Sequence, residues 1–262
     1  MEAELGGPLI ERLNRGFRLT PSGKAFLPEA RAAILSAQRA RRAARMAYDL
    51  EAGELEVATV MSIAIGLLPG SIGTLRARYP GILVELHEYL HKRVLEDDVR
   101  GGVADIAIGP RPREWEGPVK SLGWEEFVVV LPQGDPSLQD PGPLELSDLA
   151  QRRWVMPAPT AGLAPLVAGA CGDAGFIPHP AVHTSQVEAL ARLAASGLGP
   201  TMLPSNVIAP DLQPLTKRLR RPVARELAAY TRNDWSPVAG AFLEVLLAAH
   251  SARRPPNAYI MG

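Results

Sequence analysis

Residues 53–70 read GELEVATVMSIAIGLLPG, and the alternation that begins there decides the fold class. The run from Leu55 to Val60 is apolar enough for a buried strand, and Gly66 to Tyr79 reads as a helix. Strands alternating with helices are typical of βαβ units around a largely parallel sheet. The sequence therefore predicts an α/β protein with two Rossmann-like units. Further strands are expected at 82–87, 105–109, 127–131, 154–156, 180–183, 201–203 and 227–231, and further helices at 91–100, 163–174, 187–196 and 237–252.

The composition fits a folded protein with a balanced charge. The chain has 262 residues, of which 47% are hydrophobic and 21% charged, and its formal net charge is zero. This balance removes any whole-chain electrostatic reason to expect a nucleic-acid or membrane partner. Residues 1–50 are nevertheless basic, with nine Lys or Arg against five Asp or Glu.

The cysteine content and the apolar runs indicate a compartment. The single cysteine, Cys171, cannot form an internal disulfide, and its expected role is packing. No apolar run approaches the roughly 20 residues that a membrane span needs. We therefore expect a cytoplasmic protein with no membrane contact, no metal and no cofactor.

Residues 20–50 are predicted to form a long helix with an alanine seam. Thr20 is a suitable N-cap, and Pro21 suits the first helical position. Small or apolar residues then recur with the 3.5-residue period of a coiled coil. One interpretation is a surface helix that packs on its own body; we favour a dimerisation helix. The seam residues are Phe26, Ala30, Ala33, Ala37, Ala40 and Ala44.

Three hydroxyl side chains follow predicted strands, at the points where helices begin. They are Ser62, Thr160 and Ser185, with Gln186 next to the last. Ligands of open α/β sheets bind at such carboxyl ends of strands. The alternative is that each hydroxyl only caps its helix. Because Met61 and its neighbours are apolar, the first junction suits an organic acid with a hydrophobic body.

Two further patterns have a functional and a plain interpretation. Arg111 and Arg113 could pair with a carboxylate, although arginines in a Pro-rich loop are more often solvated. His87-Glu88-Tyr89-Leu90-His91 matches the H-E-x-x-H motif of zinc hydrolases, for which His179 and His183 are weak third-ligand candidates. The motif requires a helix, whereas residues 82, 84 and 86 alternate as in a strand. We expect no zinc site.

The order of parts resembles that of LysR-type transcriptional regulators. The resemblance rests on Glu4-Leu5-Gly6, on Leu9 to Arg12, on Arg15 to Gly23, and on Glu188-Ala189-Leu190 with Gly197-Leu198-Gly199 and Leu203-Pro204. It implies that residues 1–19 are the end of a winged helix-turn-helix, with Leu9–Leu13 and Gly16–Leu19 as its wing. Residues 20–50 would be the linker helix, and 54–262 an effector domain like a periplasmic binding protein. Its lobe I would comprise 54–122 and 230–262, and its lobe II 123–229.

The resemblance also implies partners. Promoter DNA would bind the full-length form, a small organic acid would bind between the lobes near Ser62, Met61, Thr160, Ser185 and Gln186, and the chains would assemble as dimers or tetramers. Arg12, Arg15, Arg18 and Lys24 would contact phosphates, which position a protein without specifying sequence. Since residues 1–5 match only the end of a recognition helix, we expect this chain to bind DNA weakly and without sequence specificity. The remaining alternative is a stand-alone small-molecule binding protein without DNA binding.

Overall fold

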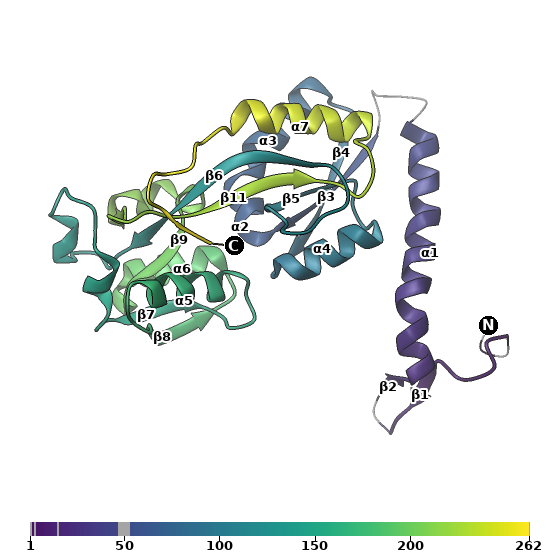
Figure 1. The fold of residues 1–262 in the computed structure, drawn as a ribbon, viewed down its shortest axis with the longest axis horizontal. Helices are drawn as coiled ribbons and strands as arrows, with labels where there is room; N and C mark the ends of the chain where they lie inside the picture. The colour runs from purple at the N-terminus through teal and green to yellow at the C-terminus, as the bar shows by residue number, and fades with distance from the viewer. Residues whose placement is uncertain (1, 3, 15, 47–52, 262) are drawn as a thin grey trace.

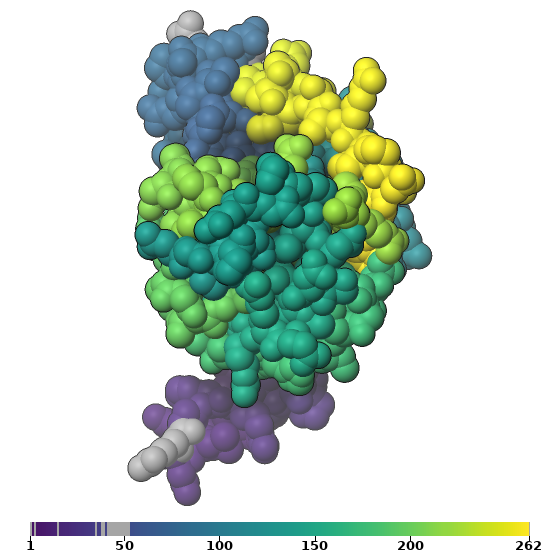
Figure 2. All heavy atoms as spheres, turned by 90° about the vertical axis from the view of Figure 1, so that its left-hand side faces the viewer, coloured from purple at the N-terminus to yellow at the C-terminus, as the bar shows by residue number. Residues whose placement is uncertain are grey.

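The computed structural model describes residues 2, 4–14, 16–46 and 53–261. A two-lobed α/β body lies beside one long helix, which carries a small hairpin at its N-terminal end (Figure 1). The predicted fold class, with two α/β lobes, is confirmed. Seen from the side of lobe II, the hairpin end of the long helix projects beyond the body (Figure 2).

The hairpin and the long helix are joined by a close contact. β1 (Ile10–Arg12) pairs antiparallel with β2 (Phe17–Leu19), and α1 (Pro21–Met46) follows. Thr20 Oγ1 accepts a 3.0 Å hydrogen bond from the Gly23 N–H, so Thr20 is the helix cap that the sequence predicts. A Cβ atom on Gly23 would lie 2.0 Å from the carbonyl oxygen of Leu9. Only glycine at this position lets the hairpin pack on the helix.

Lobe I has parallel strands covered by helices. Strands β5 (Ile106–Pro110), β3 (Glu54–Val60) and β4 (Leu83–Tyr89) lie side by side in that order. All three are parallel, as βαβ units require. The helix predicted from Gly66 begins earlier and consists of two helices, α2 and α3. The lobe comprises β3 (Glu54–Val60), α2 (Met61–Gly66), α3 (Leu68–Arg78), β4 (Leu83–Tyr89), α4 (Lys92–Gly101), β5 (Ile106–Pro110) and α7 (Pro237–Ala249).

Two long antiparallel strands cross from one lobe to the other. β6 (Val119–Val130) and β11 (Val223–Tyr230) pair along their length, and their register shifts between Leu227 and Ala228. Opposite this bulge Gly123 has φ +98°, a conformation that favours glycine. The sequence predicted only the apolar ends of these strands, because Lys120, Ser121 and Glu125 interrupt the apolar pattern of β6. The bulge lies near the boundary between the two hydrophobic cores, and we call this region the hinge.

Lobe II contains a separate parallel pair, β7–β8, and short strands that pair with β6. Near the end of the chain, β12 pairs with β11 at Val223 and Ala224, and Met261 packs in the hydrophobic core of this lobe. The lobe comprises β7 (Arg153–Pro157), α5 (Leu163–Asp173), β8 (His179–Thr184), α6 (Val187–Leu193), β9 (Thr201–Pro204), β10 (Thr216–Lys217), β12 (Tyr259–Ile260) and short helical turns at 136–138, 146–149, 194–198, 205–207 and 210–215.

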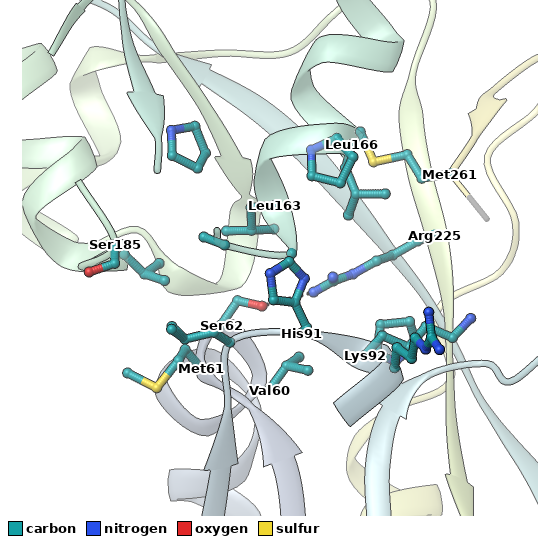
Figure 3. A pocket seen from close by; sticks show the side chains of 18 of the residues that line it. Val60, Met61, Ser62, His91, Lys92, Leu163, Leu166, Ser185, Arg225 and Met261 are labelled. Atoms are coloured by element: carbon teal, nitrogen blue, oxygen red, sulfur yellow. Dashed lines mark hydrogen bonds between the residues drawn. The ribbon is translucent and has the colours of Figure 1, made fainter. Parts of the chain in front are cut away.

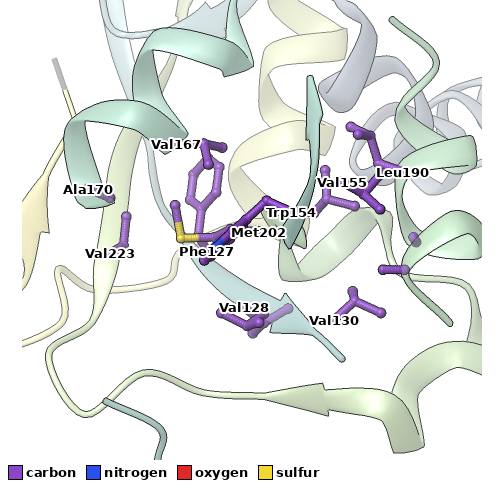
Figure 4. Close-up of a cluster of buried hydrophobic side chains, with 14 of the residues drawn as sticks. Phe127, Val128, Val130, Trp154, Val155, Val167, Ala170, Leu190, Met202 and Val223 are labelled. Atoms are coloured by element: carbon purple, nitrogen blue, oxygen red, sulfur yellow. The ribbon is translucent and has the colours of Figure 1, made fainter. Parts of the chain in front are cut away.

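Each lobe has its own hydrophobic core. In lobe II, Phe127, Trp154 and Val167 pack with Met202 and Val223 (Figure 4). Cys171 is fully buried in the same cluster, and burial raises the pKa of its thiol to about 12. This placement agrees with the packing role expected for it. Among the helices that the structure describes, none is long and apolar enough to cross a bilayer.

Candidate functional site

A cavity of about 280 Å³ lies between the two lobes (Figure 3). Lobe I contributes the carboxyl end of β3, the start of α2 and the N-terminal turn of α4. Lobe II contributes the N-terminal turn of α5 and the start of α6, and the crossing strand β11 contributes Arg225. The cavity is therefore at the carboxyl ends of strands, where α/β proteins bind ligands.

Ser62 lies where β3 passes into α2, and it is buried. Its Oγ atom accepts a 2.9 Å hydrogen bond from Nη2 of Arg225 (Figure 3). Since Arg225 occupies a lone pair of this oxygen, the hydroxyl hydrogen of Ser62 stays available to an acceptor in the cavity.

Arg225 is itself held by a buried acid. Its Nε donates to Oε1 of Glu125 on the neighbouring strand β6, and both side chains are only 4% exposed. Asn206 Nδ2 donates to the other carboxylate oxygen of Glu125 at 3.3 Å, and the guanidinium lies 5.5 Å from the centre of the Phe127 ring. A buried charge needs such a partner. The pair fixes the guanidinium at the cavity without adding net charge.

The N-terminal end of α4 adds further charged groups. Lys92 Nζ donates to the carbonyl oxygen of Arg111 at 2.7 Å and lies 3.8 Å from Oε1 of Glu96. Burial lowers the pKa of Lys92 despite the nearby Glu96, and burial raises the pKa of Glu96 despite Lys92 and Arg100. Desolvation thus disfavours the charge of both groups. A ligand carboxylate would restore a favourable environment for the ammonium.

The lobe II side of the cavity is apolar. Leu163 and Leu166 of α5 face it together with Val187 and Leu190 of α6, and Met261 lies beside Leu166 (Figure 3). No side chain caps the N-terminus of α4 or α5, whose first turns border the cavity. Such termini favour negative charge. The arrangement suits a ligand with an anionic end and a hydrophobic body.

The structure brings together some of the predicted ligand residues. Met61, Ser62 and Ser185 line the cavity, whereas Thr160 and Gln186 are exposed and do not line it. Helix capping does not explain the three hydroxyls, because the cap residues of α2, α5 and α6 are Val60, Gly162 and Gln186, and none of them caps through its side chain.

The H-E-x-x-H motif does not form a zinc site. His87 and Glu88 lie within strand β4, where consecutive side chains point to opposite faces, and His91 precedes α4. His179 is exposed on β8, and His183 Nδ1 lies 3.2 Å from the carbonyl oxygen of Pro157. In the described part of the chain, Glu54, Glu56 and Glu85 are grouped closely enough for a cation, but an acidic group alone is no evidence for one.

Of the two arginines in the loop after β5, one pairs with a side chain of the protein and the other is exposed to solvent. Nη1 of Arg111 lies 3.0 Å from Oε1 of Glu226, which also accepts from Ser121 Oγ at 2.7 Å. Arg113 is exposed. Arg111 thus pairs with a carboxylate of the protein itself.

Arg225, Glu125 and Lys92 were not identified from the sequence. The apolar pattern predicts a strand that begins only at Leu227, so Arg225 falls outside the predicted elements. The sequence does contain a signal for this buried pair. Arg225 lies in the mostly apolar run Val223 to Tyr230, and Glu125 lies just before the apolar run from Phe127. Only the register of β6 and β11, in which Arg225 lies opposite Glu125, shows that the two side chains pair.

Comparison with known proteins identifies the fold of this two-lobed body. The LysR substrate binding domain matches residues 49–251. The chain belongs to the LysR family. As a LysR-type transcriptional regulator, it carries in these residues the effector-binding domain of the family, and the resemblance noted in the sequence is confirmed.

Individual LysR relatives match over most of their length. The transcriptional dual regulator GltC of Bacillus subtilis is 28% identical over 211 residues, covering 80% of this chain and 70% of GltC. The HTH-type transcriptional regulator ShiR of Corynebacterium glutamicum is 30% identical over 202 residues, covering 76% of this chain and 68% of ShiR. The crystal structure of CbnR, a LysR family transcriptional regulator, superposes with a TM-score of 0.70 at 22% identity, covering 95% of this chain and 86% of CbnR.

Proposed function

We propose that the cavity binds a small organic acid as the effector of this regulator. The observation that carries the proposal is the hydrogen bond from Arg225 to Ser62, which presents a hydroxyl donor beside a guanidinium, opposite the apolar lobe II side of the cavity. The ligand carboxylate would accept from Ser62 and lie within the field of Arg225 and Lys92. Its hydrophobic body would contact Leu163, Leu166 and Met261.

The energetics favour a carboxylate with an apolar body over an inorganic anion. A hydrogen bond to a charged group contributes about 1.5–3 kcal/mol. Each buried methylene adds about 0.8 kcal/mol. An inorganic anion would gain only the first contribution and would leave the wall of Leu163, Leu166 and Leu190 unused.

Effector binding would act on DNA through the linker helix. A ligand that binds one arrangement of the lobes more tightly shifts the population toward it. The helix α1 lies beside α4, whose first turn borders the cavity. Paired α1 helices would transmit the change to the DNA-binding heads of the full-length protein, in the cytoplasm and without catalysis.

The hairpin would contribute phosphate contacts in such a complex. Arg12 and Arg18 are exposed on the hairpin, and Lys24 is exposed in the first turn of α1. Arg18 already lies 2.7 Å from Glu11, so it would exchange that ion pair for a phosphate. The predicted fourth contact, Arg15, lies outside the described residues.

Isothermal titration calorimetry of the full chain against small aliphatic and aromatic monocarboxylates tests the effector proposal. Ser62→Ala should weaken the tightest binder about tenfold or more, because a charge-assisted hydrogen bond is lost. Thr160→Ala is the matched control: it removes a hydroxyl near the same cavity that does not line it, so its affinity should be unchanged. A panel without any binder, or an equal loss in both variants, would overturn the proposal.

A further inference from the structure

A third segment, besides β6 and β11, crosses between the lobes. We call residues 251–261 the crossing segment. It leaves the end of α7 on lobe I and returns to the middle of the molecule, where β12 pairs with β11 (Figure 1). Its last described residue, Met261, belongs to the core of lobe II and lines the cavity.

The crossing segment is tied first at the hinge. The backbone N–H of Trp124 donates a 3.0 Å hydrogen bond to the carbonyl oxygen of Ala252. The neighbouring Gly123 has no room for a side chain, since a Cβ atom there would lie 2.7 Å from the same oxygen. Arg254 lies over the Trp124 ring at 5.5 Å. The path of the segment is therefore fixed where the two lobes meet.

The far end of the crossing segment is tied to β11, beside Arg225. The Tyr259 N–H donates to Pro222 O at 2.8 Å, and the Met261 N–H donates to Ala224 O at 2.9 Å. The Arg221 guanidinium lies 5.9 Å from the centre of the Tyr259 ring. The hydroxyl of Tyr259 lies so close to Gly169 that a Cβ atom there would be 3.1 Å from it. These contacts place the backbone of Met261 next to the residue before Arg225.

We infer that Met261 limits the length of the ligand. Met261 is 6% exposed, and its side chain lies with Leu166 on the same side of the cavity as Arg225 (Figure 3). A ligand body that extends toward this side from an anionic end near Ser62 meets the thioether. Methionine is unbranched and adaptable, so it fills such a space without a rigid shape. The inference rests on the proposed binding of organic acids in this cavity.

The test uses straight-chain carboxylates from butanoate to dodecanoate, with Kd measured by calorimetry for each. In the unmodified chain, affinity should rise with length to an optimum and then fall. Met261→Ala removes Cγ, Sδ and Cε, so the optimum should move to longer chains by about three carbons, with a gain of about fourfold for each added methylene. Met261→Trp should move it to shorter chains.

Ile260→Ala is the matched control. It removes apolar atoms from the neighbouring residue of the same segment, and Ile260 does not line the cavity. It should leave the optimum length unchanged. Thermal unfolding of each variant checks that the chain is folded, and the opposite shift expected for Met261→Trp does not depend on the stability of the alanine variant.

A second series separates this inference from the proposed function. Primary alcohols of the same lengths lack the carboxylate, but their alkyl chains would contact the same apolar side of the cavity, including Met261. If alcohols bind and carboxylates do not, the organic-acid proposal fails, and the shift in optimum length is scored on the alcohols. An unchanged optimum in both Met261 variants overturns the inference, as does a chain that binds neither series.

Discussion

The Gly162 N–H donates a 2.7 Å hydrogen bond to the carbonyl oxygen of Leu90. Leu90 lies in lobe I, between the end of β4 and the start of α4. Gly162 lies in lobe II, directly before α5. The bond therefore joins the lobes at the two helix N-termini that border the cavity. A Cβ atom on Gly162 would lie 2.8 Å from that carbonyl oxygen, so the contact requires glycine.

Gly162→Ala is expected to separate the lobes at this contact. The added methyl group collides with backbone that has little freedom to move, and the hydrogen bond is worth about 1 kcal/mol. We expect a larger radius of gyration by small-angle X-ray scattering and about fivefold weaker binding of the best carboxylate.

Gly172→Ala is the control for Gly162→Ala. Gly172 lies in α5, and no atom lies within 4 Å of the position of its Cβ. Alanine is the better helix former, so this variant should be as stable as the unmodified chain or more so, with unchanged lobe separation. Identical scattering curves for Gly162→Ala and the unmodified chain would show that the bond does not hold the lobes.

The buried pair of Arg225 and Glu125 should make a large contribution to stability. Glu125→Gln leaves the guanidinium buried without its countercharge, so the free energy of unfolding should fall by about 3–5 kcal/mol. Arg225→Met should cost a similar amount. Urea denaturation of both variants measures the loss.

The double variant Glu125→Gln, Arg225→Met distinguishes charge pairing from local packing. Because neither charge remains, its loss should be well below the sum of the two single losses. Additive losses would mean that the two side chains stabilise the hinge independently.

The lobes could be predicted from the sequence, but the hinge could not. Buried strands such as Leu55 to Val60 are continuous apolar runs, which the sequence displays directly. The crossing strands mix Lys120, Ser121 and Glu125 with apolar residues, because they pass from one core to the other across the cavity. Their length depends on pairing between residues about a hundred positions apart, which no local pattern reports.

The sequence predicted those residues of the candidate site that lie directly after a strand. Met61 and Ser62 follow β3 directly, so the rule that ligands bind there identified them. Thr160 and Gln186 satisfy the same rule, but both are exposed and do not line the cavity, although their neighbours Ala161 and Ser185 do. Met261 could not be found by this rule, because the crossing segment has no strand or helix pattern before its last residues.

His250 should make stability depend on pH. It lies at the end of α7, with Nε2 3.3 Å from Ser71 Oγ of α3, and burial lowers its pKa. The unfolded chain therefore binds the proton more readily than the folded chain. The free energy of unfolding should fall as the pH drops below about 6.5 and level off below the lowered pKa.

Urea denaturation between pH 8 and pH 5 measures this dependence. His250→Gln should show a smaller decrease over the range. His179→Gln, which changes an exposed histidine on β8, should retain the full decrease. If His250→Gln and the unmodified chain lose stability in parallel, other groups cause the dependence.

The alanine seam of α1 should hold two chains together. Phe26 and Ala30 are half-buried, and Ala33, Ala37 and Ala40 are exposed on the single chain, as expected of a surface that awaits a second helix. The side chain of Ala44 lies outside the described residues.

Ala33→Glu with Ala37→Glu would bring like charges together across such a seam. We expect the dimer Kd to rise about tenfold or more, measured by analytical ultracentrifugation. Ala33→Ser keeps the small size without charge and should remain dimeric, so an undiminished dimer in the double glutamate variant would place the contact on another face of the chain.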